Sequence, residues 1–351
     1  MPRGSSVVVV SASFGAGHDG AADELARRLR TQGRTVHRHD FVDLLPRRLG
    51  VLLRGLYRRQ LTVAPRSWGW LLALAGADLL SGRAATLTAA ADEATLAAVG
   101  SDAHLVVSTY PLASQVLGRL RRQGRLAVPV VTYLTDLSVH PLWIADGVDV
   151  HLALHDDSAR QAKELGAPDV RVVAPAVRPA FCPATPAVDR AALGLPARGP
   201  LALIVAGAWG VGQVERAALD VAATGLAVPV VACGRNDGLR RRLNRSGRVL
   251  ALGWVGDMAG LVRACQVVVQ NAGGLSSVEA LAAGVPVVTY RCLPGHGAAN
   301  AEVLDRVGWA PWLRGRADLA GGLRAALTGA TSYAPAPLLP ETVLADLAVA
   351  A

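Results

Sequence analysis

Apolar and polar positions follow each other in blocks along this chain, with short runs of β-branched and other apolar residues followed by segments of helical spacing. The apolar runs cover residues 7–10, 105–107, 130–134, 151–154, 201–205, 229–232, 266–270 and 286–290. After the first run, Ala22, Leu25, Ala26 and Leu29 fall on one face of a predicted helix. Strands that alternate with helices predict parallel sheets, and hence an α/β fold of doubly wound domains.

The length and the proline distribution predict two domains. A chain of 351 residues suits two α/β domains of roughly 150 residues, each large enough for its own core. Six prolines interrupt residues 174–200, where no periodicity is clear. We therefore assign residues 1–178 to a first domain and 179–330 to a second, with the linker at 179–186. The Ala- and Pro-rich tail, 331–351, is expected to be loosely ordered.

The net charge of +9 favours anionic partners such as nucleotides, nucleic acids or anionic lipids. Residues 44–77 contain no acid and interleave six arginines with leucines and tryptophans. This combination is typical of a segment that lies on a membrane surface, although an Arg-rich helix packed by its leucine stripe has the same pattern. No nucleic acid partner is expected, because only 4% of the residues are aromatic and no recognised binding motif is present.

The cellular compartment is inferred from the length of the apolar stretches and from the spacing of the cysteines. No apolar stretch reaches the roughly 18 residues that span a bilayer, so no transmembrane helix is expected. A single Arg precedes the apolar run at 7–10, which predicts a buried strand rather than a secretion signal. The four cysteines, at 182, 233, 265 and 292, lie far apart, so neither zinc nor a disulfide is expected. These features predict a cytoplasmic protein.

A glycine-rich turn follows the first predicted strand. Gly15, Gly17 and Gly20 match the pattern G-x-G-x-x-G, and Asp40 lies about 20 residues further on, as in nicotinamide-dinucleotide sites. The match has low specificity, because any strand-to-helix turn whose backbone approaches an anion needs glycine. His18 lies inside this turn, where its imidazole either exchanges protons with a substrate at neutral pH or caps the helix.

Two further glycine turns, in the second half, are predicted to bind a diphosphate. They comprise residues 207–212 and 271–277, and each follows an apolar run. Backbone N–H groups and the positive end of a helix dipole bind phosphate without a metal ion. Glu279 lies one turn further along the same predicted helix, where its carboxylate either accepts both ribose hydroxyls or stabilises the helix start.

The remaining loops of the second half supply candidate contacts to the base and the sugar. Residues 253–258 form a possible wall for the base, although Trp254 would serve equally well as a core aromatic. Residues 294–302 join a strand to a helix at the end of the sheet where ligands bind. The predicted contacts to a nucleotide sugar are Gly207, Gly210, Trp254, Val255, Gly273, Gly274, Leu275, Ser276, Glu279, His296 and Asn300. No metal ligand is predicted.

Four motifs, in order along the chain, carry a family resemblance. SASFGAGH at 11–18, TDLSVHPLW at 135–143, AVRPAF at 176–181 and AGGLSSVEA at 272–280 resemble the monogalactosyldiacylglycerol synthase group, which is similar to the MurG glycosyltransferases. The order of motifs extends over residues 7–307. The resemblance implies a GT-B fold, in which two Rossmann-like domains face each other across a cleft. It also implies that the first domain binds the acceptor and the second binds a UDP-sugar.

The resemblance further implies an inverting transfer of a hexose from a UDP-sugar to the hydroxyl of a membrane lipid such as diacylglycerol, with no cofactor and no divalent metal. By this likeness His18 is the first candidate for the base, and Asp136 and His140 are candidates to accept, relay or orient the proton. The segment at 44–77 corresponds to the membrane-contacting region of the family. Peripheral attachment to the inner face of the membrane, on its anionic surface, is therefore expected.

One departure from the family pattern leaves the substrates open. Family members commonly have Gln and an acid where this chain has His296 and Gly297. The donor sugar is therefore not fixed by the resemblance. The acceptor is diacylglycerol, a polyprenyl lipid or a soluble, hydrophobic natural product.

Three other classes of protein fit parts of the pattern. An NAD-dependent oxidoreductase would explain the turn at 15–20 and Asp40, but it would not need a second set of phosphate-binding turns. A UDP-sugar epimerase would need carboxylates in its cleft and no basic amphipathic stretch. A catalytically silent binding partner would need neither His18 nor Glu279.

Overall fold

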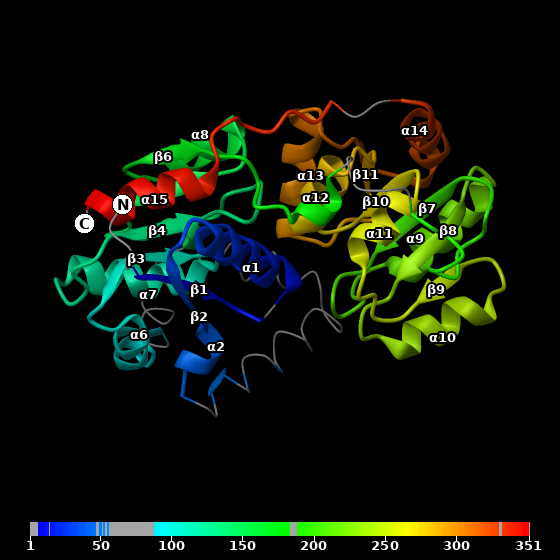
Figure 1. The fold of residues 1–351 in the computed structure, drawn as a ribbon. Helices are drawn as coiled ribbons and strands as arrows, with labels where there is room; N and C mark the ends of the chain where they lie inside the picture. Colours follow the sequence, from blue (N-terminus) through cyan, green and yellow to red (C-terminus); the bar gives the residue numbers. More distant parts are fainter. Residues whose placement is uncertain are drawn as a thin grey trace. The chain divides into compact units, whose positions relative to one another are not determined.

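The computed structural model describes residues 6–13, 15–46, 49–50, 52, 55, 88–182, 188–329 and 332–350. The predicted membrane-contacting segment at 44–77 lies mostly outside the described residues. The chain forms two compact units (Figure 1): the described residues up to Ala176 together with those from Pro335 onward, and the described residues from Val177 to Ala334. Each unit contains one six-stranded sheet, so the predicted α/β fold of two doubly wound domains is confirmed.

The sheet of the first unit has the strand order β2-β1-β3-β4-β5-β6, and all neighbouring strands are parallel. Its strands are β1 (Ser6–Ser11), β2 (Thr35–Asp40), β3 (Ala103–Ser108), β4 (Val130–Tyr133), β5 (Val150–Ala153) and β6 (Val170–Val172). From β1 the chain runs to β2 on one side and later crosses to β3 on the other. The carboxyl ends of β1 and β3 therefore form the switch point at which open α/β sheets bind ligands.

Helices cover the faces of this sheet. They are α1 (Ala16–Thr31), α2 (Phe41–Leu44), α6 (Asp92–Val99), α7 (Pro111–Arg122), α8 (Asp156–Glu164) and α15 (Pro340–Ala350), with the 3-10 turn η1 (Pro141–Trp143). The predicted apolar face of α1 is confirmed, because Ala22, Leu25, Ala26 and Leu29 are completely buried. Across the described part of the chain, none of the helices combines the length and the hydropathy that a membrane span requires.

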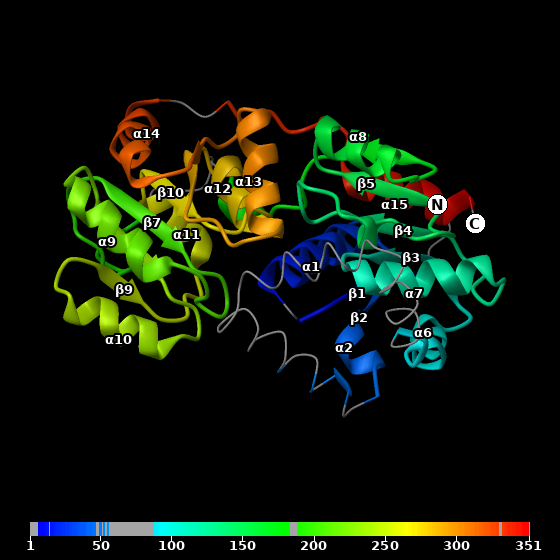
Figure 2. The ribbon, with the colours of Figure 1, turned by 180° about the vertical axis from the view of Figure 1, so that it is seen from behind.

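The end of the chain differs from the loosely ordered tail that was predicted for 331–351. Residues 340–350 form α15, which belongs to the first unit and lies against it in Figures 1 and 2. Val343, Leu344 and Ala348 are buried, and Arg28 of α1 donates a hydrogen bond to Glu341 at 3.1 Å. The prediction was wrong for this segment because Ala and Leu favour helix, and their apolar stripe has a surface to cover.

The sheet of the second unit has the order β12-β11-β10-β7-β8-β9, again with parallel neighbours. Its strands are β7 (Leu201–Val205), β8 (Val228–Ala232), β9 (Leu250–Leu252), β10 (Val267–Gln270), β11 (Val287–Tyr290) and β12 (Trp312–Leu313). This is the strand order of dinucleotide-binding folds, with the switch point between β7 and β10. The glycine turns at 207–212 and 271–277 follow these two strands, so the topology brings them together.

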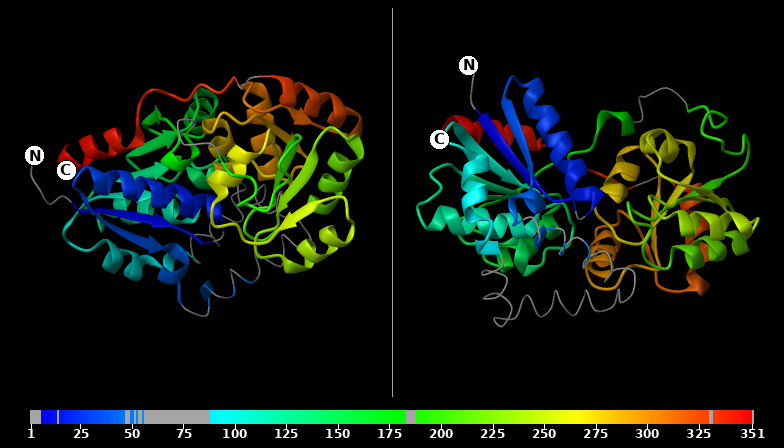
Figure 3. Two further views of the ribbon diagram at one scale, coloured as in Figure 1. Left: turned by 45° about the vertical axis from the view of Figure 1, so that its right-hand side comes forward. Right: turned by 90° about the horizontal axis from the view of Figure 1, so that it is seen from below.

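Helices lie on both faces of this second sheet as well (Figure 3). They are α9 (Val214–Thr224), α10 (Asp237–Arg245), α11 (Met258–Ala264), α12 (Leu275–Ala282), α13 (His296–Arg306) and α14 (Arg316–Thr328), with the 3-10 turn η2 (Pro179–Phe181) at the start of the unit. The core between sheet and helices contains Ile204, Val221, Val231, Val269 and Leu323. This packed core fixes the carboxyl ends of the strands, and with them the starting points of the loops that follow.

One buried side chain of the first unit predicts how stability depends on pH. His151 of β5 is fully buried, and burial lowers its pKa to about 4. The unfolded chain takes up this proton near pH 6.5, whereas the folded chain does not, so the free energy of unfolding falls as the pH drops from about 6.5 towards 4. The full effect is about 3 kcal/mol.

Urea unfolding between pH 7.5 and 5 measures this effect. The wild type is expected to lose about 2 kcal/mol more than His151→Leu over that interval, since leucine has no proton to gain. Equal losses in the two proteins would show that His151 does not carry the pH dependence.

Candidate active site

His18 lies at the switch point of the first unit, in the first turn of α1. Its Nδ1 is 2.9 Å from the backbone oxygen of Thr109 and 2.9 Å from the hydroxyl of Thr135. Thr109 follows β3 directly, and Thr135 lies just beyond the end of β4. The carboxyl ends of three neighbouring strands, β1, β3 and β4, therefore hold one imidazole ring.

These contacts set the proton arrangement of the ring. The Thr109 carbonyl can only accept a hydrogen bond, so Nδ1 carries the hydrogen when this bond is made. Both hydrogen bonds of the ring to described residues involve Nδ1, which leaves the lone pair on Nε2. The Thr109 hydroxyl also donates to the backbone oxygen of His18 at 3.2 Å. His18 is thus oriented as a proton acceptor through Nε2, rather than serving only as a helix cap.

Aromatic rings fix the plane of the His18 imidazole. Tyr110 meets it edge-on with a centroid distance of 5.3 Å, and the buried ring of Trp143 lies 6.0 Å away. His140 is also 6.0 Å from Trp143. The structure therefore gathers His18 and His140 around one tryptophan, as a shared site would require.

The predicted partner segment at 135–143 contacts His18 through a different residue from the one expected. The side chain that meets the ring is that of Thr135, while Asp136, the next residue, is half-buried beside it. Sequence reasoning missed Thr109, Tyr110 and Thr135. Their only signal is the position of small polar residues directly after apolar strands, where ligands of α/β folds bind.

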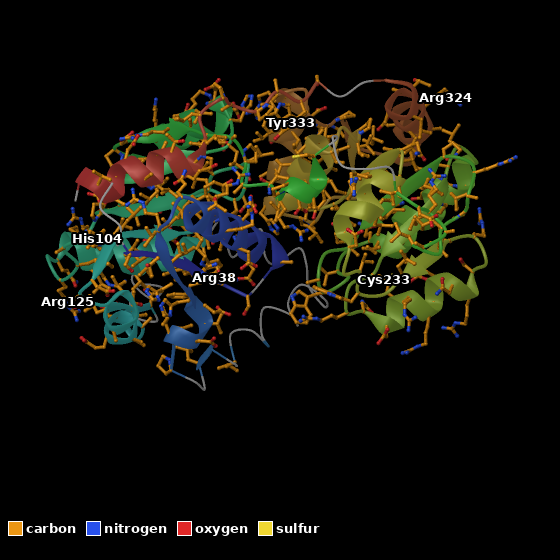
Figure 4. The ribbon with its side chains drawn as sticks, in the orientation of Figure 1. Arg38, His104, Arg125, Cys233, Arg324 and Tyr333 are labelled. Atoms are coloured by element: carbon orange, nitrogen blue, oxygen red, sulfur yellow. The ribbon has the colours of Figure 1, made fainter. Side chains whose placement is uncertain are left out.

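The turn that precedes His18 is fixed by charged side chains. Arg38 of β2, labelled in Figure 4, donates to the Ser11 hydroxyl at 2.9 Å and to the Asp19 carboxylate at 2.5 Å. Asp40 accepts from the backbone N–H of Ser13 and caps α2. The carboxylate that a dinucleotide ribose would need thus serves as a helix cap, which disfavours the oxidoreductase hypothesis.

The first glycine turn of the second unit is packed tightly against its neighbours. Gly210 has a φ of 57°, and a Cβ at this position would lie 2.7 Å from the Asn236 side chain and from the Cys233 carbonyl. Asn236 donates to the Gly210 carbonyl at 3.0 Å and caps α10. Glycine is therefore required here by both backbone conformation and space.

The second turn, after β10, offers fewer free N–H donors than the sequence predicts. The Gln270 side chain accepts from the N–H groups of Ala272 and Gly273, so these two groups are not available to a ligand. The first backbone bond of α12 runs from the Ser277 N–H to the Gly274 carbonyl. The remaining donors are the N–H groups of the preceding first turn, which point out of the positive end of the helix.

Two of the predicted sugar contacts occupy different environments. Asn300 is fully buried and donates to the Ala272 carbonyl at 3.1 Å, while a Cβ on Gly273 would lie 2.3 Å from it. Asn300 thereby supports the turn through Ala272, and its direct contact to the sugar stays a prediction. His296, the first residue of α13, is only half-buried and stays a candidate contact.

Glu279 is an almost buried carboxyl group on α12. Its side chain is 12% exposed and its Oε1 lies 3.6 Å from Arg178. Burial raises its pKa to about 7, although the Arg178 guanidinium opposes that rise. A carboxylate with so few partners is stabilised by any hydroxyl groups that donate to it, as two ribose hydroxyls would.

Trp254 is exposed, so the interpretation of this residue as a core aromatic is wrong. Its exposed fraction is 58%. The guanidinium of Arg235 lies 4.7 Å from the Trp254 ring centroid and 5.8 Å from that of Trp209. These planar groups, from loops after three neighbouring strands, form a surface on which a base can stack.

Metal-binding side chains are not clustered in the described parts of either unit. Among those residues, no group of three or more His, Cys, Asp and Glu is placed to hold a metal ion.

Known proteins resemble this chain both in sequence and in structure. Residues 18–174 match the sequence model of the family described as monogalactosyldiacylglycerol (MGDG) synthase. A processive diacylglycerol beta-glucosyltransferase from Bacillus cereus (strain B4264) is 29% identical over 223 residues, which are 60% of this chain and 56% of that protein. The chain thus spans little more than half the length of the curated relatives it matches.

Two solved structures share the fold. MurG from Acinetobacter baumannii has a TM-score of 0.53 and 15% identity, and covers 98% of this chain and 94% of its own. Alr3699/HepE from Anabaena, in complex with UDP-glucose, has a TM-score of 0.55 and 16% identity, and covers 92% of this chain and 90% of its own. The predicted resemblance to the MGDG synthase and MurG group is confirmed, and so is the GT-B fold.

Proposed function

We propose that this chain is an inverting glycosyltransferase that moves a hexose from a UDP-sugar to the hydroxyl of a diacylglycerol-like membrane lipid. The observation that carries the proposal is the orientation of His18 at the switch point of the first unit, with Nδ1 bonded to Thr109 and Nε2 left as acceptor. The relative named above as a diacylglycerol beta-glucosyltransferase supports the choice of acceptor, and the solved structure in complex with UDP-glucose supports the choice of donor. In this proposal the first unit binds the acceptor and the second binds the donor.

The reaction uses His18 as the base. Nε2 takes the proton of the acceptor hydroxyl while the acceptor oxygen attacks the anomeric carbon from the face opposite the diphosphate. The bond from the anomeric carbon to the diphosphate oxygen breaks, and its electron pair leaves with UDP. Asp136 and His140 are proposed to accept, relay or orient the proton that His18 receives.

The second unit stabilises the leaving group. Negative charge develops on the diphosphate as the bond breaks, and the first turn of α12 directs N–H donors and the positive end of its dipole towards such a charge. In this assignment Gly207, Gly210, Gly273 and Gly274 shape the diphosphate site, and Leu275 and Ser276 supply donors. Trp254 and Val255 bind the base, Glu279 binds the ribose, and His296 contacts the sugar.

Transfer is expected to be independent of divalent metal, because helix donors neutralise the diphosphate in this mechanism. Initial rates in EDTA should equal those in Mg²⁺ or Mn²⁺ within about twofold. If the rate is lost in EDTA and recovers with either cation, a metal ion rather than the helix donors neutralises the charge on the leaving diphosphate.

The protein is further proposed to act at the inner face of the cytoplasmic membrane as a peripheral protein on an anionic surface. The arginines and apolar residues at 44–77 supply the pattern that binds such surfaces. The lipid acceptor of the relatives supports the same location.

Calorimetric titration of the purified protein tests the proposed class of enzyme. UDP is expected to bind in buffer without divalent metal, and NAD is expected not to bind. Binding of NAD alone would overturn the proposal in favour of an oxidoreductase. Binding of UDP without transfer to diacylglycerol would direct the acceptor screen to polyprenyl lipids and soluble natural products.

A further inference from the structure

Arg291 has a backbone conformation that side chains rarely adopt. Its φ is 49°, and it is the one non-glycine residue with a positive φ among the residues that the structure describes. It lies directly after β11, where the chain enters the segment 292–300 that carries His296. The left-handed region brings Cβ close to the following carbonyl oxygen, so a residue other than glycine occupies it only when other contacts hold it there.

Hydrogen-bond partners of the Arg291 side chain come from α9 and its N-cap. Arg291 donates through Nε to the Asp220 carboxylate at 2.8 Å and through Nη1 to the Gln213 side chain at 2.8 Å. The hydroxyl of Tyr290 donates to the same carboxylate at 2.9 Å. We name Gln213, Asp220, Tyr290 and Arg291 the Asp220 network. The Asp220 side chain is only 13% exposed, so this ion pair is weakly screened by water.

The network joins the two walls of the predicted donor-sugar site. Gln213 is the N-cap of α9 and follows the glycine turn at 207–212 directly, while Arg291 directly precedes segment 292–300. Beyond Arg291, the Leu293 N–H donates to the Asn271 carbonyl at 2.7 Å. The Leu293 side chain also lies 2.8 Å from the position that a Cβ on Gly212 would take. Segment 292–300 is therefore packed at Leu293 against both glycine turns, so a change in the exit angle at Arg291 disturbs these contacts.

We propose that Arg291 is a positioning residue that determines which hexose the donor site accepts. The inference rests on the proposed function. The ion pair with Asp220 holds segment 292–300 in one place against the glycine turns, and it thereby fixes His296, the candidate contact to the sugar of the donor. A site that hydrogen-bonds sugar hydroxyls in a fixed place rejects an epimer whose hydroxyl points elsewhere, because polar groups are then left unpaired. When segment 292–300 shifts, the hydrogen bonds to the preferred hexose weaken, and the difference in kcat/KM between the two epimers becomes smaller.

Two substitutions of Arg291 separate the ion pair from the backbone conformation. Arg291→Gly removes the guanidinium but adopts positive φ without strain, whereas Arg291→Ala removes the guanidinium and keeps the strain. Asp220→Asn weakens the pair from the other side with little change in size. For each protein, kcat/KM is measured with UDP-glucose and with UDP-galactose, which differ only at the C4 hydroxyl, and Kd is measured for UDP.

In Arg291→Gly and in Asp220→Asn, the ratio of the two kcat/KM values is expected to fall at least about tenfold towards one, mainly through loss with the preferred donor. The Kd for UDP should stay within about threefold of wild type, because the nucleotide contacts are unchanged. Arg306→Ala, which breaks an exposed ion pair with Glu302 on the same helix α13, serves as the matched control and should keep the wild-type ratio.

Other outcomes overturn the inference. If Arg291→Gly keeps the wild-type ratio while Arg291→Ala loses activity, the network serves only the backbone turn. A wild type that uses both epimers equally, or a Kd for UDP that rises in parallel with the loss of kcat/KM, also contradicts a role in sugar choice. A wild type that transfers no hexose from any UDP-sugar contradicts the proposed function, and the inference falls with it.

Discussion

His18→Ala lowers kcat for hexose transfer by about 10²- to 10⁴-fold while leaving the Kd for UDP within about threefold of wild type. The large effect is expected because His18 is the proposed base, and Thr109 and Thr135 serve to orient its ring. The small effect on Kd is expected because the proposed nucleotide contacts all belong to the second unit. Steady-state kinetics and calorimetric titration of the same preparation measure the two quantities.

A matched histidine controls for nonspecific damage. His37→Ala removes an exposed imidazole from β2 of the same unit and should leave kcat unchanged. Thr135→Val keeps the size of the side chain but removes the hydroxyl at Nδ1. It should therefore lower kcat by an intermediate factor, about tenfold. Equal losses of kcat and of UDP affinity in His18→Ala would instead place His18 in the donor site or in the fold.

Glu279→Ala weakens UDP binding by about 10- to 100-fold, the second-largest expected effect. Two ribose hydroxyls that donate to one carboxylate contribute hydrogen bonds to a charged group, each typically worth about 1.5–3 kcal/mol. The low exposure of the Glu279 side chain, 12%, limits competition from water. Glu302→Ala removes an exposed carboxylate from α13 of the same unit and should leave the Kd unchanged. An unchanged Kd in Glu279→Ala would remove the ribose role.

The raised pKa of Glu279 predicts in which direction the affinity for UDP-glucose changes with pH. Its pKa in the free protein is about 7, and the carboxylate is the form that accepts two hydroxyls. Affinity for UDP-glucose should therefore fall as the pH drops from 8 to 6, by up to about tenfold per unit below 7. UDP-glucose is the suitable probe because its diphosphate, esterified at both ends, has no proton to gain in this range. Glu279→Gln should bind with a Kd that varies less over this pH range than that of the wild type.

The sequence predicts the central strands of both sheets and misses the edges. All eight apolar runs correspond to strands, whereas β2, β6, β9 and β12 were not predicted. These four are the outermost strands of the two sheets. An edge strand is covered less completely than a central one, so its pattern carries fewer apolar residues: β2, for example, reads TVHRHD and has one buried position. Apolar periodicity detects only strands that are buried on both faces.

Residues of the candidate site could be predicted where a side chain able to react or bind lies next to a glycine turn in the sequence. His18 and Glu279 were found because each lies beside a glycine turn. Thr109 and Thr135 were missed because they meet His18 across sequence separations of 91 and 117 residues, and threonine after a strand has no distinctive pattern. The Gln270 side chain, which occupies two N–H groups of the phosphate turn, depends on a rotamer that no spacing rule predicts.

Glycolipid synthesis by the purified protein tests the central claim most directly. The protein is incubated with UDP-glucose or UDP-galactose and vesicles that contain diacylglycerol and anionic lipid, in EDTA, and the lipid extract is analysed by mass spectrometry and NMR. The account predicts a hexosyl-diacylglycerol with a β-linkage, inverted from the α-linked donor, and an equal amount of UDP. A product that keeps the α-linkage, or protein that binds UDP but leaves diacylglycerol unmodified with both donors, would contradict it.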